Sequence, residues 1–432
     1  MPHQDDIIFK ARYNNISMPA TLHPFLKTVH NSKIVSNEQF ESYLQTTRLR
    51  DGLSDEQVAK HTVIKNLLTL FQAEEILNGR TRKLVVEDYI LVDILGYGGM
   101  GTVYIGKHRE SEKKVAIKLL GEQTKHDAGI RARFQLEARA GMKLDHPKLV
   151  KTLEFGMLQE LYGDTEFMVM ELVAGVTLLE GINFSNGPMK WDAASDVICQ
   201  AADGLHYLHS QGMVHRDVKP DNILIEVNGN SKLLDFGLTL ADEGGFEDEF
   251  SLAMIFGHDC LGTADYIPPE QSRDSLQVDH RADIYSLGCT LYTALTAKRP
   301  FPGRKRVETV KAHRTEPRPI VLESNPNVPP ELSDAVFQMM SVNPDERPQS
   351  MLDVQDLLAP FRNRRNWAFE FSQVLIQRRE MRKKYISESR ARSNQNQRPT
   401  TVNAQVETET PGKKKVIGDQ IIDETDSMKP TK

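Results

Sequence analysis

The chain has 432 residues, and its 54 Lys and Arg against 60 Asp and Glu give a net charge of −6. This balance lacks the basic excess that nucleic-acid binding usually shows, so no nucleic-acid partner is expected. The three cysteines, Cys199, Cys260 and Cys289, have no Cys-x-x-Cys spacing, which disfavours a disulfide framework or structural zinc and predicts a reducing, cytoplasmic location. No apolar run approaches the ~20 residues that cross a bilayer, and the first residues do not resemble a signal peptide. We therefore expect a soluble protein.

The N-terminal part is predicted to contain a small helical module. Residues 1–32 are polar with three prolines, and we expect loose structure there. Residues 36–39 and 54–57 each place Gln three positions after Ser, a capping-box pattern that opens a helix. Apolar residues at helical spacing follow the second box, and Asn78-Gly79 supplies a stop. The apolar face of this module, at residues 33–80, either packs on the neighbouring domain or binds a partner.

A glycine-rich stretch lies between two predicted strands. Residues 89–95 are largely apolar, residues 96–101 read Gly-Tyr-Gly-Gly-Met-Gly, and residues 102–105 form the second strand. The pattern also fits a dinucleotide-binding turn, but such a turn needs a helix after the last glycine, where this chain has β-branched and aromatic residues. We therefore predict a hairpin. Because glycine has no Cβ, the backbone N–H groups of this hairpin can approach phosphate oxygens closely.

A lysine and a glutamate follow the glycine-rich stretch. Lys118 lies in the next predicted strand, after Ala116, and a lysine in a half-buried strand is costly unless it has a function. Glu137 lies on a predicted helix, residues 131–139. A glutamate on a charged helix is usually solvated. Its place after the lysine strand and before His146-Pro147 favours an ion pair between Lys118 and Glu137 instead.

Two further motifs surround a predicted hairpin. Residues 215–222 read His-Arg-Asp-Val-Lys-Pro-Asp-Asn, and Asp235-Phe236-Gly237 begins thirteen residues after Asn222. Apolar residues flank the turn Asn228-Gly229-Asn230 between them, so the chain is expected to return two carboxylates and a carboxamide to one place. Phosphoryl transfer needs such a set. One carboxylate orients and deprotonates a hydroxyl, and an Asn with a second Asp holds Mg²⁺ against a triphosphate.

These motifs, in this order, resemble those of the eukaryotic-like (Hanks-type) serine/threonine protein kinases of bacterial type. The resemblance covers roughly residues 89–360. It implies an α+β, bilobal protein kinase fold with a small helical N-terminal extension. It divides the chain into an extension with the helical module (1–88), a protein kinase domain (89–361), and a basic helix with a disordered tail (362–432). The implied activity is transfer of the γ-phosphate of ATP, with Mg²⁺, to Ser or Thr hydroxyls of protein substrates.

The resemblance also implies a role for each motif residue. Asp217 would orient the substrate hydroxyl and accept its proton, while Lys219 would steady the γ-phosphate. Asn222 and Asp235 would bind Mg²⁺, and Lys118, paired with Glu137, would hold the α- and β-phosphates. The other implied nucleotide-binding positions are Leu95, Gly96, Gly98, Gly99, Gly101, Val103, Ala116, Glu171, Val173 and Leu224. A competing hypothesis is a scaffold that binds ATP without turnover, but such a protein has no chemical need for all of these groups.

Two supporting roles and one departure follow from the same resemblance. Asp283 would hold the catalytic loop through its backbone, and Arg347 would pair with Glu270 inside the large lobe. Members of the family usually carry a bulky apolar residue one turn after the helix glutamate, whereas this chain has Gly141. Glycine in a helix interior costs about 1 kcal/mol relative to alanine, so Gly141 is expected to weaken the positioning of this helix.

A second departure concerns the activation segment. Kinases with an Arg before the catalytic Asp, as Arg216 is here, usually need an anion such as phosphothreonine to order that segment. Between Thr239 and Thr263 the only Ser or Thr is Ser251. The acidic residues of this stretch are either a solvated loop or include a carboxylate, Asp259 being the first choice, that replaces the phosphate.

The last 71 residues are predicted to differ from the kinase domain. Residues 362–392 mix basic residues, including Arg378-Arg379, with Trp367 and other apolar side chains, which predicts a basic amphipathic helix. That helix either docks on the kinase domain or binds an anionic partner or membrane surface. From Ser393 onward, low hydrophobicity predicts disorder.

Overall fold

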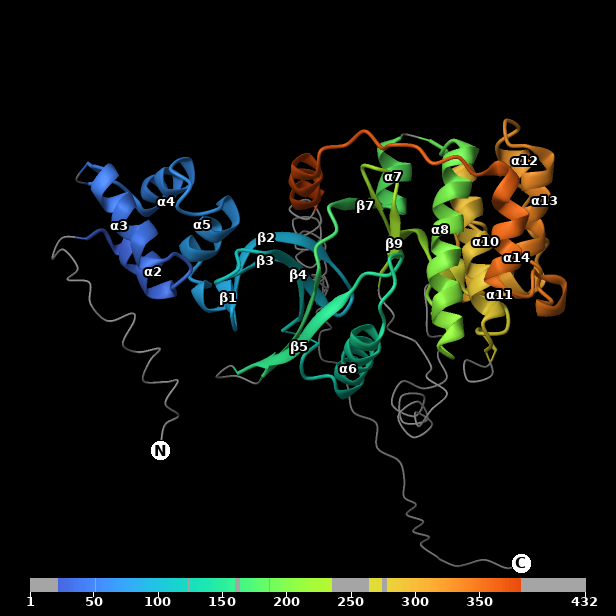
Figure 1. Ribbon diagram of the computed structural model, residues 1–432, viewed down its shortest axis with the longest axis horizontal. Helices are drawn as coiled ribbons and strands as arrows, with labels where there is room; N and C mark the ends of the chain where they lie inside the picture. Colours follow the sequence, from blue (N-terminus) through green and yellow to red (C-terminus); the bar gives the residue numbers. More distant parts are fainter. Residues whose placement is uncertain are drawn as a thin grey trace, which may run out of the picture. The chain divides into compact units, whose positions relative to one another are not determined.

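The computed structural model describes residues 22–50, 52–122, 124–159, 164–185, 187–234, 264–273 and 278–381, without the side chains of residues 82 and 83 (Figure 1). All of them fall within one compact unit of the chain, Met1–Met381. Among the helices in these ranges, none has the length and apolar character needed to span a bilayer.

Four short helices form the N-terminal module: α2 (Pro24–Ser32), α3 (Asn37–Thr46), α4 (Asp55–Ile64) and α5 (Leu70–Leu77), followed by the one-turn helix η1 (Thr81–Leu84). Both predicted capping boxes are present, at Ser36 and Ser54. A third box at Thr69, which the sequence reading missed, opens α5. The expectation of loose structure up to residue 32 is wrong for α2, because its apolar face, including Phe25 and Leu26, is buried in the module.

The module packs on the neighbouring sheet, which is the first of the two expected alternatives. Its buried side chains share one hydrophobic cluster with residues of the sheet strands. The Gln72 side chain donates to the Leu91 carbonyl over 2.9 Å, and the Thr69 hydroxyl donates to the Val92 carbonyl over 2.7 Å. Apolar burial and these two hydrogen bonds therefore fix α5 against the sheet.

The small lobe contains an antiparallel sheet in the order β1-β2-β3-β4-β6-β5 and the helix α6 (Ala128–Lys143). Its strands are β1 (Val85–Val86), β2 (Tyr89–Tyr97), β3 (Gly101–His108), β4 (Lys114–Leu120), β5 (Thr152–Leu158) and β6 (Thr165–Glu171). Successive side chains of a strand point to opposite faces. On β4, Val115 and Ile117 accordingly join the cluster with the N-terminal module, while Ala116 and Leu120 join a second cluster with α6. The sheet is thus covered on both faces.

The large lobe begins with a small sheet of β7 (Gly175–Thr177), β8 (Ile223–Glu226) and β9 (Ser231–Leu233). The predicted hairpin is β8 and β9, with Gly229 at φ 80° in its turn. The helices are α7 (Leu178–Phe184), α8 (Trp191–Ser210), α10 (Arg281–Thr296), α11 (Arg306–Thr315), α12 (Val321–Ser324), α13 (Pro330–Met339) and α14 (Met351–Leu358). Short 3₁₀ turns, η2 (Pro220–Asn222), η3 (Ala264–Tyr266), η4 (Pro344–Glu346) and η5 (Ala359–Phe361), complete it.

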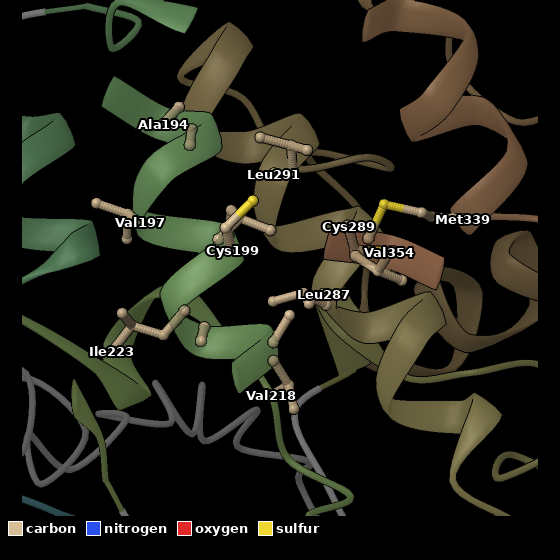
Figure 2. Close-up of a cluster of buried hydrophobic side chains, with 14 of the residues drawn as sticks. Ala194, Val197, Cys199, Val218, Ile223, Leu287, Cys289, Leu291, Met339 and Val354 are labelled. Carbon is tan, nitrogen blue, oxygen red and sulfur yellow. The ribbon is translucent and has the colours of Figure 1, made fainter. Parts of the chain in front are cut away.

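The core of the large lobe lies between α8 and α10. Figure 2 shows Cys199 of α8 and Leu287 of α10 among the clustered side chains, together with Val218 and Ile223. The last two residues flank η2, and both are fully buried. The same core that holds the helices together therefore anchors the chain on both sides of Lys219 and Asn222. This two-lobed α+β arrangement is the one that the sequence predicts.

The region after α14 differs from the prediction. Residues 362–370 are not helical, and a helix occupies residues 371–381. The predicted helix is wrong over the first part because its backbone groups bond to the large lobe: Asn363 N donates to Asp192 O over 3.1 Å and Trp367 N donates to Val227 O over 2.7 Å. We call residues 362–370 the strap and residues 371–381 the C-terminal helix. Residues from 382 onward, which include the end of the predicted helix and the predicted disordered tail, lie outside the described ranges, as do Ser251 and Asp259 of the activation segment. The three-way division of the chain stays a prediction.

Candidate active site

Lys118 and Glu137 form the predicted ion pair. Lys118 lies on β4, opposite Val103 of β3, and its ammonium is 2.7 Å from the Glu137 carboxylate on α6. The two side chains are only 8% and 3% exposed. A buried ammonium needs such a partner, because removal from water is costly for an uncompensated charge. The geometry places a fixed cation on the sheet face opposite the N-terminal module.

A second carboxylate holds α6 to the sheet. Glu166 of β6 is 2% exposed and accepts hydrogen bonds from Arg131, at 2.9 and 3.1 Å, and from Gln135, at 2.7 Å. Both donors lie on α6, Gln135 about two turns and Arg131 about three turns before the helix reaches Gly141. The departure at Gly141 therefore does not prevent the pairing of Glu137 with Lys118. Charge-assisted bonds to a buried carboxylate are among the stronger polar contacts in proteins.

Asp283 supports the catalytic loop as predicted. Its buried carboxylate accepts the backbone N–H of His215 over 2.9 Å and that of Arg216 over 2.8 Å. Arg216 has φ 64°, a left-handed conformation that costs a non-glycine residue about 1 kcal/mol. Burial alone would raise the pKa of Asp283, yet the hydrogen bond with His209 and the nearby His215 hold the pKa below its ordinary value. Asp283 therefore stays ionised and stabilises the strained loop.

Three of the predicted catalytic and metal-binding side chains meet at Asp217. The Asp217 carboxylate accepts from Lys219 Nζ over 2.5 Å and from Asn222 Nδ2 over 3.2 Å. Asn222 Nδ2 also donates to the Asp217 carbonyl over 2.8 Å. The fourth residue, Asp235, lies outside the described ranges. Its described neighbour Leu234 donates its N–H to the Asn222 carbonyl over 2.8 Å.

The apolar positions expected to face a nucleotide gather in one cluster. Ala116 and Val173 are buried in it, and Leu95, Val103 and Leu224 pack against it. The Glu171 side chain instead leaves this cluster, accepting from Lys232 over 2.6 Å and from the Lys151 N–H over 2.9 Å. Any contact of Glu171 with an adenine would therefore run through its backbone, as the resemblance implies. The ligand roles of these residues stay predictions.

The glycine-rich hairpin is formed by the end of β2 and the start of β3. A Cβ on Gly101 would fall 1.9 Å from the Leu119 carbonyl, so only glycine fits there. A Cβ on Gly96 or Gly99 would meet no atom within 4 Å, and Gly98 donates its N–H to the Gly101 carbonyl over 2.8 Å. The space beside Gly96 and Gly99 is open on the described surface, as close approach of phosphate oxygens requires.

Polar contacts between distant segments support the large lobe around the site. Arg347 makes the predicted two-pronged ion pair with Glu270, at 2.7 and 2.9 Å. The Gln271 amide donates to the Arg216 carbonyl over 2.9 Å, and His209 lies 2.8 Å from Asp283. The sequence reading missed Gln271 and His209. Their partners are 55 and 74 residues away, so local sequence carries no signal for these contacts.

Comparison with known proteins agrees with this geometry. The protein kinase domain model matches residues 89–358. The chain is 36% identical over 270 residues to the serine/threonine-protein kinase PknB of Mycolicibacterium smegmatis, which covers 62% of this chain and 42% of that relative. It is 32% identical over 267 residues to the serine/threonine-protein kinase PrkC of Bacillus subtilis, covering 62% of this chain and 39% of the relative. The match thus spans less than half the length of these relatives. The fold, the motifs and the matched residues together show that the chain belongs to the protein kinase family.

Proposed function

We propose that this protein is a serine/threonine protein kinase that acts on protein substrates, in signalling. The observation that carries the proposal is the convergence of Lys219 and Asn222 on the Asp217 carboxylate, on a loop held by Asp283. Lys219 stands two residues after Asp217, which is the serine/threonine-specific pattern of the family. The competing scaffold hypothesis requires none of this arrangement.

Protein kinases generally use ATP and Mg²⁺, and the described residues fit both. The apolar cluster around Ala116 suits an adenine, the open glycine-rich hairpin suits phosphates, and Lys118 supplies a fixed positive charge. We propose that Asn222 holds Mg²⁺ together with Asp235. Carboxamide and carboxylate oxygens are the ligands that this hard cation prefers.

The chemistry of the proposed reaction follows from these side chains. Bound ATP would supply the phosphoryl group, and bound Mg²⁺ would offset the negative charge of the phosphates. Asp217 orients the substrate hydroxyl and accepts its proton at the carboxylate, which lies on the surface side of the loop at 21% exposure. Lys219 neutralises negative charge beside Asp217, and Lys118, fixed by Glu137, holds phosphate oxygens in the reacting arrangement.

The test is transfer of radiolabelled phosphate from ATP to a peptide library in the presence of Mg²⁺. The wild-type protein should label Ser or Thr, and Asp217→Asn should abolish labelling while its melting temperature stays within a few degrees. The control is Asp334→Asn, which removes an exposed carboxylate on α13. Equal incorporation by wild type and Asp217→Asn would falsify the enzyme reading. Nucleotide binding without labelling by the wild type would favour the scaffold.

Two further proposals concern surroundings rather than chemistry. We propose a cytoplasmic location, supported by Cys199 and Cys289, which are free and buried. An anionic partner or membrane surface for the basic C-terminal region is also a proposal. Arg378 and Arg379 already pair with carboxylates of the protein, so this proposal now falls on the lysines and arginines after residue 381.

A further inference from the structure

The strap runs from the large lobe toward the small lobe; in Figure 1 it is the orange-red coil between α14 and the dark red C-terminal helix. Arg364 and Arg365 pair with Asp196 and Asp192 of α8. The Trp367 ring covers Gly181 of α7, where a Cβ would come within 2.5 Å of it. These contacts hold the strap on the large lobe. They place the C-terminal helix near residues 172–174, which join β6 of the small lobe to β7 of the large lobe.

Arg378 of the C-terminal helix contacts both lobes at once. Its guanidinium makes a two-pronged ion pair with Glu180 of α7, at 2.6 and 2.7 Å. It also donates to the Leu95 carbonyl of β2 over 3.0 Å and to the Gly175 carbonyl of β7 over 3.3 Å. Its side chain is only 13% exposed. A planar fork with five N–H donors can serve one carboxylate and two carbonyls together, whereas a lysine ammonium has three donors on a single atom.

The Leu95 carbonyl needs an outside donor because of a break in the sheet. The pairing of β2 with β3 has two β-bulges, one between Leu91 and Asp93 and one between Ile94 and Gly96. A bulge leaves its extra residue out of the hydrogen-bond ladder. The extra residues are Val92 and Leu95. The Val92 carbonyl receives the Thr69 hydroxyl of the N-terminal module, and the Leu95 carbonyl receives Arg378.

The C-terminal helix is also attached to the small lobe beside Leu95. Arg379 makes a two-pronged ion pair with Asp93, two residues earlier on β2. Val374, one turn before Arg378, is 2% exposed. The helix therefore contacts the end of β2 that leads directly into Gly96. Arg378 connects that end to α7 and β7 of the large lobe.

We propose that Arg378 is a positioning residue for nucleotide binding, which sets the glycine-rich hairpin relative to the large lobe. The inference rests on the proposed function, because it assumes that the nucleotide lies beneath this hairpin. Two residues that border the predicted pocket lie next to contacts of Arg378. Leu95 immediately precedes the glycine-rich hairpin, and Val173 is two residues before Gly175. Loss of Arg378 lowers the fraction of molecules with the pocket in its binding arrangement, and apparent affinity falls by the same factor.

The test compares Arg378→Met and Arg378→Lys by steady-state kinetics. For Arg378→Met the KM for ATP should rise about tenfold, with kcat and the KM for peptide within twofold of wild type, since the chemical step does not involve Arg378. Arg378→Lys, which keeps the charge but loses the fork, should raise the KM for ATP by a smaller factor. The matched control is Gln377→Met, an exposed neighbour on the same helix that should behave as wild type.

Glu180→Gln tests the partner. The Glu180 carboxylate also accepts the Thr177 N–H over 2.8 Å in the capping box of α7, and glutamine can keep that bond. The KM for ATP should rise with Glu180→Gln. Adding Glu180→Gln to Arg378→Met should produce no further increase, because one interaction is removed in both.

Calorimetric binding of ATP with Mg²⁺ separates this inference from the proposed function. The role of Arg378 is overturned if Arg378→Met has an unchanged Kd for ATP. It is also overturned if Gln377→Met loses as much kcat and ATP affinity as Arg378→Met does. Normal nucleotide binding by a wild-type protein that labels no peptide contradicts the proposed function alone. A wild-type protein that binds no nucleotide overturns both. If Arg378→Met does not fold, Arg378→Lys decides by the same measurement.

Discussion

The Lys118 ammonium donates to the Glu137 carboxylate over 2.7 Å, joining β4 to α6 inside the small lobe. The pair is flanked by Phe134, whose ring centroid lies 5.9 Å from Lys118 Nζ. An ammonium in such surroundings is fixed in position before any ligand arrives. In a phosphotransferase, a fixed cation stabilises the transition state and positions the reacting phosphate more than it strengthens binding of the nucleotide in the ground state.

Lys118→Met should therefore lose far more turnover than ATP affinity. We expect kcat to fall by about 100-fold or more, while the Kd for ATP rises by less than tenfold. The measurement is kcat from initial rates together with calorimetric Kd. Lys114→Met, which removes an exposed lysine from the same strand, is the matched control. A normal kcat with weakened binding would show that Lys118 only binds the nucleotide.

Glu166 gives the second prediction, because it holds the N-terminal half of α6 through Arg131 and Gln135. Glu166→Ala should release that half and weaken the alignment of Glu137 with Lys118. We expect a several-fold fall in kcat and faster hydrogen exchange of α6 amides. Glu166→Gln, which retains an acceptor oxygen, should fall between the variant and wild type. Unchanged α6 exchange in Glu166→Ala would show that the helix is held by its apolar face alone.

The parts of the site that could be predicted from the sequence are those formed by contiguous motifs. The loop around Asp217, the β8 and β9 hairpin, and the glycine-rich hairpin each combine local turn chemistry with residue types that phosphoryl transfer needs. Even the long-range pairs Lys118 with Glu137 and Arg347 with Glu270 were predictable, since family motifs name both partners.

Apart from the Thr69 capping box, which has the same spacing as the two predicted boxes, the contacts that were missed lack such a pattern. Helix α2 begins at Pro24 after a polar stretch, and tertiary burial of Phe25 and its neighbours is the main source of its stability. The strap looked helical because its basic and apolar residues alternate suitably, yet its backbone bonds to Asp192 and Val227 outweigh that preference. Arg378 meets Leu95 across 283 residues, at a carbonyl that is available only because β2 is bulged. No local feature of the sequence encodes that bulge.

The third prediction concerns pH and the buried His313. The imidazole lies in α11 at 1% exposure, with Tyr285 Oη 2.8 Å from Nδ1 and the Phe301 ring centroid at 4.8 Å from its own. Burial lowers the pKa of His313 from 6.5 to about 4. In the unfolded chain the imidazole returns to its ordinary pKa, so below about pH 6.5 the unfolded state binds a proton that the folded state refuses.

The sign of the effect follows from this difference. The contribution of His313 to stability is complete above pH 6.5 and is lost progressively as the pH falls toward 4. At pH 5 the loss in the free energy of unfolding is on the order of 2 kcal/mol. His313→Asn, which keeps an acceptor near the position of Nδ1 but does not titrate, should flatten the decline in the denaturant midpoint between pH 7 and pH 5. His126→Asn, at an exposed position, should decline as the wild type does. If His313→Asn and wild type lose stability in parallel over this range, the imidazole is protonated in the folded protein and other groups cause the acid sensitivity.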